Sequence, residues 1–336
     1  MEQNHLSKVL SDKYRSLIEA GDQVLEGHYK ISIISDAPSY FIGLDVERDP
    51  CVLIEVRGSD ISFSSPIQLD KLSAAFGVKC NVFMETEGSR VGTFTVVKCK
   101  SEDSEIIDYF WDVCALLIDR LGQFPTIVET ANAVQKVASI FELLRQPASR
   151  TVNGLFGELF FIYNAPNVEA CLDVWRTETA NTFDFSYNTC RLEVKTSSTR
   201  ERRHTFSYEQ CVPPSGICAI LCSILIERIP GGITMRQIIK GIEDKITDNH
   251  VLRFKLHEII SSTLGSSLME SLEISFDEQR ALDSLNYYDL EQIPRIREML
   301  PPGVSEVKFR SDLTNAQPLQ LAEIVEKDPS FSYLFS

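Results

Sequence analysis

The chain has 336 residues, of which 43% are hydrophobic, and this is enough for more than one sizeable core. Acidic residues outnumber basic ones by 48 to 33, and the net charge of −15 argues against a protein that coats nucleic acid non-specifically. No apolar run reaches the roughly 18 residues of a membrane-spanning helix. The first residues also lack the apolar centre of a signal peptide, so we expect a cytoplasmic protein with no membrane partner.

The first third of the chain reads as a helix followed by strands. Residues 1–20 have an amphipathic helical pattern, and five apolar, β-branched runs then follow: 29–35, 39–45, 51–56, 79–87 and 92–99. They predict an antiparallel sheet of five or six strands. Two helices are expected next, over 104–121 and 126–144, separated near Gly122. No residue pattern in this part indicates chemistry, so we interpret it as a structural or partner-binding domain.

The stretch GLFGELFFIY, residues 154–163, predicts a helix that is apolar around most of its circumference. Such a helix is buried on nearly all sides, and Glu158 lies in its middle. A buried carboxylate is costly unless it is paired or bound to a metal. Gly154 and Gly157 each weaken the helix by up to about 1 kcal/mol, but they allow another backbone to approach closely. The alternative is a partly exposed Glu158 at the edge of the helix.

The stretch FDFSYNTCRLEVKTS, residues 183–197, predicts a β-hairpin because apolar and polar residues alternate on both sides of Asn188-Thr189. With a two-residue loop, Phe185 pairs with Leu192 and Asp184 comes to lie opposite Glu193. Lys195 shares that face, about 6.6–6.8 Å farther along the strand. Two directly opposed carboxylates repel each other, so something must offset the repulsion. A shared proton, a basic side chain or a divalent cation would each do so.

A basic run follows the hairpin, in contrast to the negative charge of the whole chain. The run comprises Lys195, Arg200, Arg202, Arg203 and His204. Ser207 and Gln210 come next, where a helix is expected to follow the sheet. We interpret Arg200, Arg202, Arg203, His204, Ser207 and Gln210 as candidate contacts to phosphates of a nucleic acid or as residues that support the acidic site. The alternative is a solvated loop with scattered charges.

The rest of the chain continues as a mixture of strands and helices. Residues 217–227 are apolar enough for a central strand covered on both faces, and helices are expected over 235–246 and 250–264. The tail from Leu272 to Ser336 mixes short strands with loops. We therefore divide the chain into an N-terminal β-rich domain with flanking helices (1–122), a connecting helix (123–149) and a C-terminal domain (150–336).

Nine cysteines lie mostly in apolar surroundings, without a CxxC motif. An odd number of cysteines in a protein expected to be intracellular argues against a disulfide framework. A zinc site formed by Cys211, Cys218 and Cys222 with His204 is a weak alternative, because Cys218 and Cys222 belong to the apolar strand pattern.

These residues, in this order, resemble the PD-(D/E)XK nuclease superfamily. The segments GLFGELF, FDF, LEVKTS and RRHTFSYEQ are similar to a bacterial family of unknown function whose members are placed in that superfamily and linked to restriction or phage defence; the resemblance covers residues 150–230. It implies a restriction-endonuclease-like α-β-β-β-α-β core after the N-terminal antiparallel β-rich domain, with a C-terminal α/β extension, an α+β or α/β fold overall. Phe183 stands where the motif has proline.

Carried over to this sequence, the resemblance makes Glu158, Asp184, Glu193 and Lys195 the catalytic residues. Asp184, Glu193, the Val194 carbonyl and Glu158 would be the ligands of Mg²⁺, with Mn²⁺ as a substitute. A hard cation of this kind prefers one or two carboxylates together with water and phosphate oxygens.

The function that follows is Mg²⁺-dependent endonucleolytic cleavage of DNA in a restriction–modification or phage-defence system. Methyltransferases or ATPases of such a system are the expected partners, and the sequence leaves open whether the chain forms a homodimer. One alternative is a non-catalytic subunit with a nuclease fold that binds nucleic acid or partner proteins. Another is a sugar hydrolase, since a carboxylate separation of about 5 Å suits a retaining glycosidase. No cluster of Trp or Tyr flanks the hairpin to support the sugar hydrolase.

Overall fold

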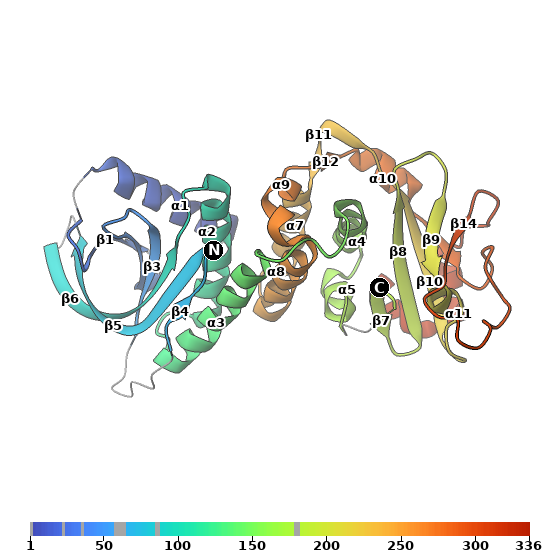
Figure 1. Ribbon diagram of the computed structural model, residues 1–336, viewed down its shortest axis with the longest axis horizontal. Coiled ribbons are helices and arrows are strands. Elements are labelled where there is room, and N and C mark those ends of the chain that lie inside the picture. The colour runs from blue at the N-terminus through green and yellow to red at the C-terminus, as the bar shows by residue number, and fades with distance from the viewer. Residues whose placement is uncertain (1–2, 22–23, 35–36, 57–64, 85–87, 178–181) are drawn as a thin grey trace. The chain divides into compact units, whose positions relative to one another are not determined.

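The computed structural model describes residues 3–21, 24–34, 37–56, 65–84, 88–177 and 182–336. The ends of two predicted strands, at Ser35 and at residues 85–87, and residues 1–2 of the predicted first helix lie outside them. Contacts between elements divide the chain into two units: unit 1 contains residues 1–147 and 247–269, and unit 2 contains residues 148–246 and 270–336 (Figure 1). The chain thus returns to unit 1 for one helix, whereas the sequence-based division ran consecutively along the chain.

Unit 1 contains a strongly curved six-stranded sheet with the order β1-β2-β3-β6-β5-β4 (Figure 1). The strands are β1 (His28–Ile34), β2 (Ala37–Leu44), β3 (Pro50–Glu55), β4 (Ile67–Gln68), β5 (Leu72–Met84) and β6 (Gly88–Cys99). Neighbours are antiparallel, as predicted, but β1 also pairs with β5 in parallel, which closes the sheet on itself. Its apolar interior includes Phe41, Leu53 and Phe94.

Helices of unit 1 match the predicted positions closely. They are α1 (Gln3–Glu19), α2 (Ser104–Leu121), α3 (Ile127–Leu143) and α8 (His250–Leu264). The Asp103 side chain caps α2, and Thr126 forms a capping box with Glu129 at the start of α3. Helix α8 packs against α2 and α3, and the Tyr109 hydroxyl hydrogen-bonds both His257 and Ser261 across that interface.

Unit 2 is built on a four-stranded sheet with the order β13-β10-β8-β7. The strands are β7 (Phe185–Tyr187), β8 (Cys190–Ser197), β10 (Cys218–Leu225) and β13 (Asn286–Asp289). Strands β8 and β10 run parallel along their whole length, from Cys190↔Cys218 to Ser197↔Leu225. The outer strands β7 and β13 are antiparallel to their neighbours. The apolar run at 217–227 therefore does form an inner strand.

Helix α4 (Val152–Asn164) lies against β8 and is also contacted by α5 (Val168–Val174) and α7 (Met235–Lys245) (Figure 1). The Thr151 hydroxyl caps it by accepting from the Gly154 N–H. A Cβ atom at Gly157 would come 2.3 Å from the Thr196 Cγ2 atom, so only glycine permits this helix–strand distance. The close packing keeps Glu158 next to the sheet.

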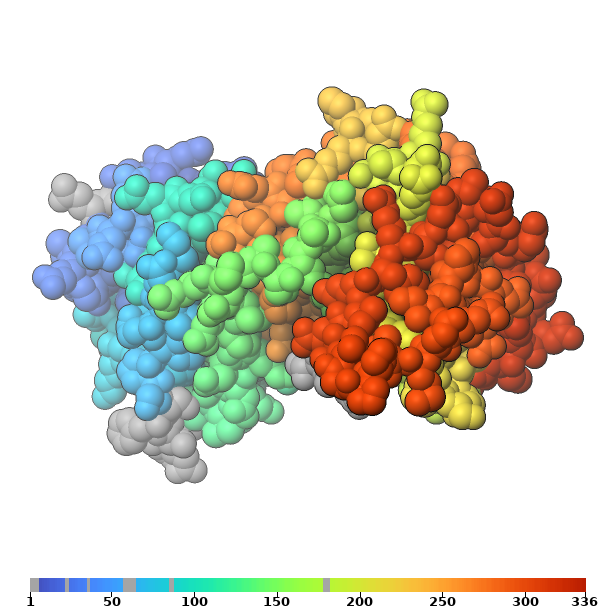
Figure 2. Space-filling model, turned by 45° about the vertical axis from the view of Figure 1, so that its right-hand side comes forward, coloured from blue at the N-terminus to red at the C-terminus, as the bar shows by residue number. Residues whose placement is uncertain are grey.

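Smaller elements complete the fold. They are β9 (Arg203–Ser207), α6 (Tyr208–Cys211), β11 (Arg228–Thr234), α9 (Leu268–Leu272), β12 (Ser275–Phe276), α10 (Glu278–Ser284), β14 (Lys308–Asp312), α11 (Leu321–Lys327) and α12 (Ser332–Phe335), with 3₁₀ turns at Gly265–Ser267 and Pro329–Phe331. Strands β9 and β14 form an antiparallel pair, as do β11 and β12. Tail residues, in red, spread over one face of unit 2 in the space-filling view (Figure 2).

The fold is a mixture of helices and several sheets, as the sequence predicted. Within the part of the chain that the structure describes, no helix combines the length and the hydropathy that crossing a membrane requires.

Candidate functional site

The β7–β8 hairpin has the predicted register. Phe185 pairs with Leu192 and Tyr187 with Cys190, across a two-residue turn in which Asn188 takes a positive φ of 47°. The ladder ends at Phe185, so Asp184 lies just before the strand. Its Oδ2 atom accepts a hydrogen bond of 3.0 Å from the Val194 N–H. Asp184 thus reaches β8 through its side chain, between Glu193 and Lys195 in the sequence of that strand.

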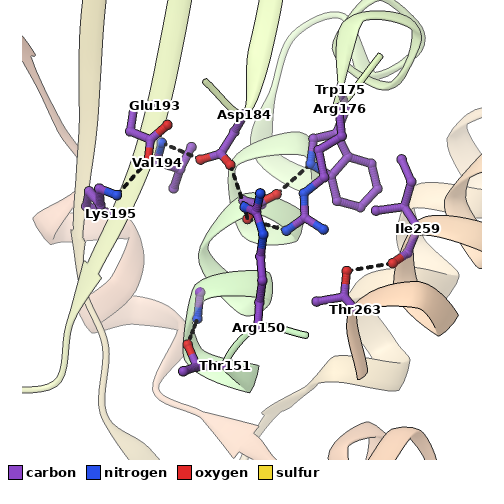
Figure 3. Close-up of polar contacts among 12 residues, drawn as sticks. Arg150, Thr151, Trp175, Arg176, Asp184, Glu193, Val194, Lys195, Ile259 and Thr263 are labelled. Carbon is purple, nitrogen blue, oxygen red and sulfur yellow. Dashed lines mark hydrogen bonds and ion pairs between the residues drawn. The ribbon is translucent and has the colours of Figure 1, made fainter. Parts of the chain in front are cut away.

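Three carboxylates are buried where α4 faces this hairpin. Glu158, Asp184 and Glu193 are only 3–4% exposed. In Figure 3, Arg176 lies on one side of Asp184, and Glu193 and Lys195 lie on the other. The prediction that Glu158 is a buried acid is therefore confirmed, and its alternative, an exposed edge position, is wrong. Buried carboxylates need partners, and each of the three has a different set.

Both oxygens of Glu158 are engaged by protein groups. Its Oε2 accepts from the Trp175 Nε1 at 2.6 Å, and its Oε1 accepts from the Arg176 Nη2 at 2.6 Å. Trp175 and Arg176 directly follow α5, and the Arg176 N–H also donates to the Asp184 carbonyl. Glu158 therefore ties α4 to the segment that leads into β7. As a metal ligand, Glu158 would have to give up one of these short bonds or act through a water molecule.

Glu193 is only half satisfied. Its Oε1 atom forms an ion pair of 2.6 Å with the Lys195 Nζ and accepts a 2.7 Å hydrogen bond from the Gln210 Nε2. Its Oε2 atom is buried and has no hydrogen-bond partner in the part of the chain that the structure describes. Leaving a buried acceptor unpaired costs about 1–3 kcal/mol, and more for a charged group. The protein groups around this oxygen give no reason for its burial. It belongs to Glu193, which the resemblance to PD-(D/E)XK nucleases makes an expected metal ligand.

Arg150 joins Asp184 to Glu158. Its Nη1 atom lies 3.2 Å from the Asp184 Oδ1 and 3.6 Å from the Glu158 Oε1, and its side chain is half exposed (Figure 3). With Arg176 and Lys195, it brings three positive charges against the three carboxylates. Two arginines thus offset part of the repulsion between the carboxylates, for which the sequence alone offered a divalent cation as one explanation.

Burial and mutual repulsion raise the pKa values of two of these acids. The pKa of Glu193 is raised by burial and then by the Asp184 charge, while Lys195 opposes the shift. The pKa of Glu158 is raised by the same two causes in the same order and is opposed by Arg176. Glu158 and Glu193 therefore lose their protons less readily than ordinary glutamates, and a further positive charge nearby would favour their ionised forms.

The donor set beside Asp184 fits a hard divalent cation. Among the described residues, Asp184 Oδ1 has only the half-exposed Arg150 as its partner, and Glu193 Oε2 has none. Because the N–H and C=O of a residue in a strand point to the same side, the Val194 carbonyl shares the strand edge on which Asp184 accepts its N–H. These are the oxygen ligands that Mg²⁺ takes up in proteins.

Another acidic group, Asp45, Glu47 and Asp49 in unit 1, brings its oxygens within 4.8 Å of one another, the one such trio among the described residues. The Lys98 Nζ already lies 2.7, 3.1 and 3.2 Å from these three carboxylates. The trio is therefore a lysine-centred ion cluster. No His or Cys of the described residues joins such a group, so the cysteines near His204 do not form the alternative zinc site.

Most residues of the basic run have structural partners. Arg202 donates to the Ser223 carbonyl and hydroxyl and to the Ser284 carbonyl. His204 is buried against the Ser223 hydroxyl, and burial together with Lys195 lowers its pKa to about 4, so it is neutral near pH 7. Arg203 pairs with Asp312 and Glu201 on the surface, and Arg200 is exposed.

The side chains of Ser207 and Gln210 make hydrogen bonds within the protein. Ser207 caps α6 in a capping box with Gln210, and Gln210 donates to Glu193 and to the Thr182 carbonyl. Gln210 thus supports the acidic site, which is one of the two roles expected for it. Sequence reasoning missed Arg150, Trp175 and Arg176, because no spacing relates them to the hairpin; an arginine just before the cap of a buried acidic helix was the available signal.

Comparison with known protein families gives one match, to the family described as "Putative PD-(D/E)XK family member (DUF4420)", over residues 10–314. The chain belongs to this family. Comparisons with curated proteins and with solved structures gave no match. The match extends well beyond the segment 150–230 that carries the motif residues, so unit 1 is a part of the family's architecture and not an unrelated addition.

Proposed function

We propose that this PD-(D/E)XK family member is a Mg²⁺-dependent endonuclease that hydrolyses phosphodiester bonds of DNA in a restriction or phage-defence system of the cytoplasm. The observation that carries the proposal is the buried Glu193 Oε2. No described residue bonds to this oxygen, although Glu193 precedes Val194, whose N–H Asp184 accepts, on β8. A buried carboxylate oxygen without a partner in that position is accounted for by a cation that it binds in the active protein.

The order of elements supports the same function. Helix α4 carries Glu158, β7 follows Asp184, and β8 carries Glu193 and Lys195; β9, α6 and β10 come next. Along the chain this order resembles the α-β-β-β-α-β core of PD-(D/E)XK nucleases, with two differences: α5 lies between α4 and β7, and β9 pairs with β14 instead of joining the four-stranded sheet. Glu158 lies on α4, Glu193 and Lys195 lie on β8, and Asp184 lies immediately before β7, so all four belong to unit 2.

Each residue then has a chemical task. Asp184, Glu193 and the Val194 carbonyl would hold the cation, which supplies an acidified water and shields the phosphate. Lys195, whose Nζ lies 2.6 Å from Glu193, would orient the attacking water or neutralise charge that develops on the phosphate. Gln210 fixes the Glu193 carboxylate, and Glu158 holds Trp175 and Arg176 behind Asp184.

The test is a nicking assay on supercoiled plasmid DNA, unmodified and base-modified, with Mg²⁺ or Mn²⁺. The full chain and an Asp184→Asn variant are compared, with methyltransferase or ATPase proteins encoded beside it added in a second series. Cleavage that needs the metal and Asp184 supports the proposal. Metal uptake without any cleavage in either series would contradict it.

A second candidate is a non-catalytic subunit that uses the nuclease fold to bind nucleic acid or partner proteins. It is favoured by one observation: Arg150, Arg176 and Lys195 already balance the three carboxylates without a metal. This candidate predicts that Mg²⁺ is not taken up and that Asp184→Asn leaves DNA or protein binding unchanged. Calorimetric titration with Mg²⁺ therefore separates the two candidates before any substrate sequence is known.

A further inference from the structure

Arg150 occupies an unusual place among the three cations of the site. Arg176 is 15% exposed and forms a 2.6 Å bond to Glu158, and Lys195 forms a 2.6 Å ion pair with Glu193. Arg150 is 50% exposed, and its contacts to Asp184 and Glu158 are longer, at 3.2 and 3.6 Å. It is therefore the cation that can leave the cluster at the lowest cost, because half of its surface is already in water.

Its place also conflicts with a metal. The Nη1 atom of Arg150 is the partner of Asp184 Oδ1, the oxygen that faces away from the Val194 N–H and remains for a cation. A guanidinium and Mg²⁺ cannot share that oxygen without strong repulsion between them. The Arg150 side chain is attached just before the Thr151 cap of α4, outside the buried part of the helix, so it can swing toward solvent without disturbing α4.

We propose that Arg150 is a displaceable cation: it neutralises Asp184 in the metal-free protein, is expelled when the metal binds, and then contacts the scissile phosphate. A planar guanidinium with several N–H donors matches phosphate oxygens better than any other side chain. The inference rests on the proposed function. It adds a phosphate-binding residue that the family motif does not contain, and it makes metal and substrate binding interdependent.

The proposal predicts opposite effects of one substitution on two ligands. In Arg150→Gln the competitor of the metal is absent, so Mg²⁺ should bind about two- to fivefold more tightly, the range expected for losing one half-exposed ion pair. The same variant should bind DNA more weakly, but only in the presence of Mg²⁺. Arg150→Lys keeps the charge and loses the planar fork, so its Mg²⁺ affinity should stay near the wild-type value while DNA binding falls.

The experiment is calorimetric titration of the full chain with Mg²⁺, followed by fluorescence-anisotropy titration of a labelled DNA duplex with and without Mg²⁺. DNA binding is measured in a Lys195→Ala background so that the duplex is not consumed. Arg191→Gln is the charge-matched control, because Arg191 lies on β8 but donates to the backbone carbonyls of Asn188 and Cys190. Melting temperatures verify that each variant is folded.

The outcomes are distinct. Tighter Mg²⁺ binding by Arg150→Gln, an unchanged Arg191→Gln and a metal-specific loss of DNA binding support the displaceable arginine. Equal or weaker Mg²⁺ binding by Arg150→Gln, with binding abolished in Asp184→Asn, overturns it and leaves the proposed function standing. Tighter Mg²⁺ binding with unchanged DNA binding overturns the phosphate contact. If the wild-type protein takes up no Mg²⁺, the proposed function itself fails.

Discussion

The protein contains two acidic clusters that differ in how their charge is balanced. In unit 1, a single lysine, Lys98, lies within 2.7–3.2 Å of Asp45, Glu47 and Asp49. The Asp45 Oδ1 atom also accepts hydrogen bonds from the Glu47 and Asp49 N–H groups, so this trio stabilises its own loop. In unit 2, each of the three acids has its own cation, and one buried oxygen of Glu193 still has no partner among the residues that the structure describes.

The comparison teaches that close spacing of acids does not by itself indicate a metal site. The more compact trio has its central position filled by an ammonium, and the pKa of Lys98 is raised far above its ordinary value by its hydrogen bonds to the acids, although burial opposes this. The looser trio has a buried oxygen for which the described residues supply no partner, and an arginine that we propose a metal displaces. Free donor atoms are the better criterion, and the predictions below test it.

The largest effect is expected from Glu193→Gln. This substitution keeps the shape of the side chain but removes the charge of the oxygen that has no partner, so DNA cleavage should fall by about 10²–10³-fold and Mg²⁺ affinity should fall with it. Single-turnover cleavage and calorimetry measure the two. Asp49→Asn is the matched control in unit 1; if it lowers cleavage as much as Glu193→Gln, the two clusters have been assigned the wrong way round.

Lys195→Ala should separate turnover from metal binding. Lys195 is proposed to act on the attacking water or the phosphate, so cleavage should fall by about 10²-fold while Mg²⁺ affinity changes by much less. Removing its charge from Glu193 also raises the pKa of that acid further, which is checked by repeating the assay at higher pH. Near-normal cleavage by a folded Lys195→Ala protein would remove Lys195 from the mechanism.

Gln210→Ala tests whether Glu193 needs to be held in place. Without the 2.7 Å hydrogen bond to Oε1, the carboxylate loses its orientation, and Mg²⁺ affinity should fall by about tenfold, the lower end for residues that support a metal ligand. Gln237→Ala is a suitable control, because Gln237 makes the same kind of capping box at α7 without contacting an acid. An unchanged affinity in Gln210→Ala would show that Lys195 positions Glu193 alone.

Lys98→Met probes the cluster of unit 1. Removing the ammonium leaves three acids to repel one another, but Glu47 is 69% exposed and solvent screens it, so we expect a loss of about 1–2 kcal/mol in the free energy of unfolding. Urea denaturation measures it, and DNA cleavage per folded molecule should not change. Reduced cleavage by the folded variant would mean that unit 1 communicates with the catalytic site.

The smallest effect concerns pH. Glu193 has a pKa raised above its ordinary value of 4.5, so the metal-free folded state holds a proton that the unfolded chain has already released. That contribution to stability is complete below about pH 4.5 and is lost as the pH rises through the folded pKa. Thermal unfolding should therefore show a larger stabilisation by Mg²⁺ at pH 8.5 than at pH 6, with protons released on binding. Equal shifts at both pH values would contradict the raised pKa.

Local patterns in the sequence predicted much of the fold. Alternation fixed the hairpin register, because a two-residue turn at Asn188-Thr189 leaves a single pairing. Apolar patterns and turn residues predicted α2, α4, α7 and α8 within a few residues. The return of α8 to unit 1 and the parallel β1–β5 pairing were not predicted, since both depend on contacts between residues far apart in the chain.

The candidate site was predicted only in part, for the same reason. Glu158, Asp184 and Glu193 do come together, but the arginines that neutralise two of them arrive from outside the motif. Arg202 and His204 were candidates for phosphate contacts because of their charge and position. In the structure, both hydrogen-bond Ser223 inside the protein. Sequence spacing cannot distinguish a basic side chain that faces solvent from one that fills the interior.

The most direct test of the central claim is the anomalous diffraction of a crystal soaked in Mn²⁺. We predict a peak within about 2.0–2.3 Å of Asp184 Oδ1 and Glu193 Oε2, with the Arg150 side chain turned away from Asp184. No peak there, with Arg150 still bound to Asp184 at saturating Mn²⁺, would contradict the claim and leave this chain a nuclease fold without a metal centre.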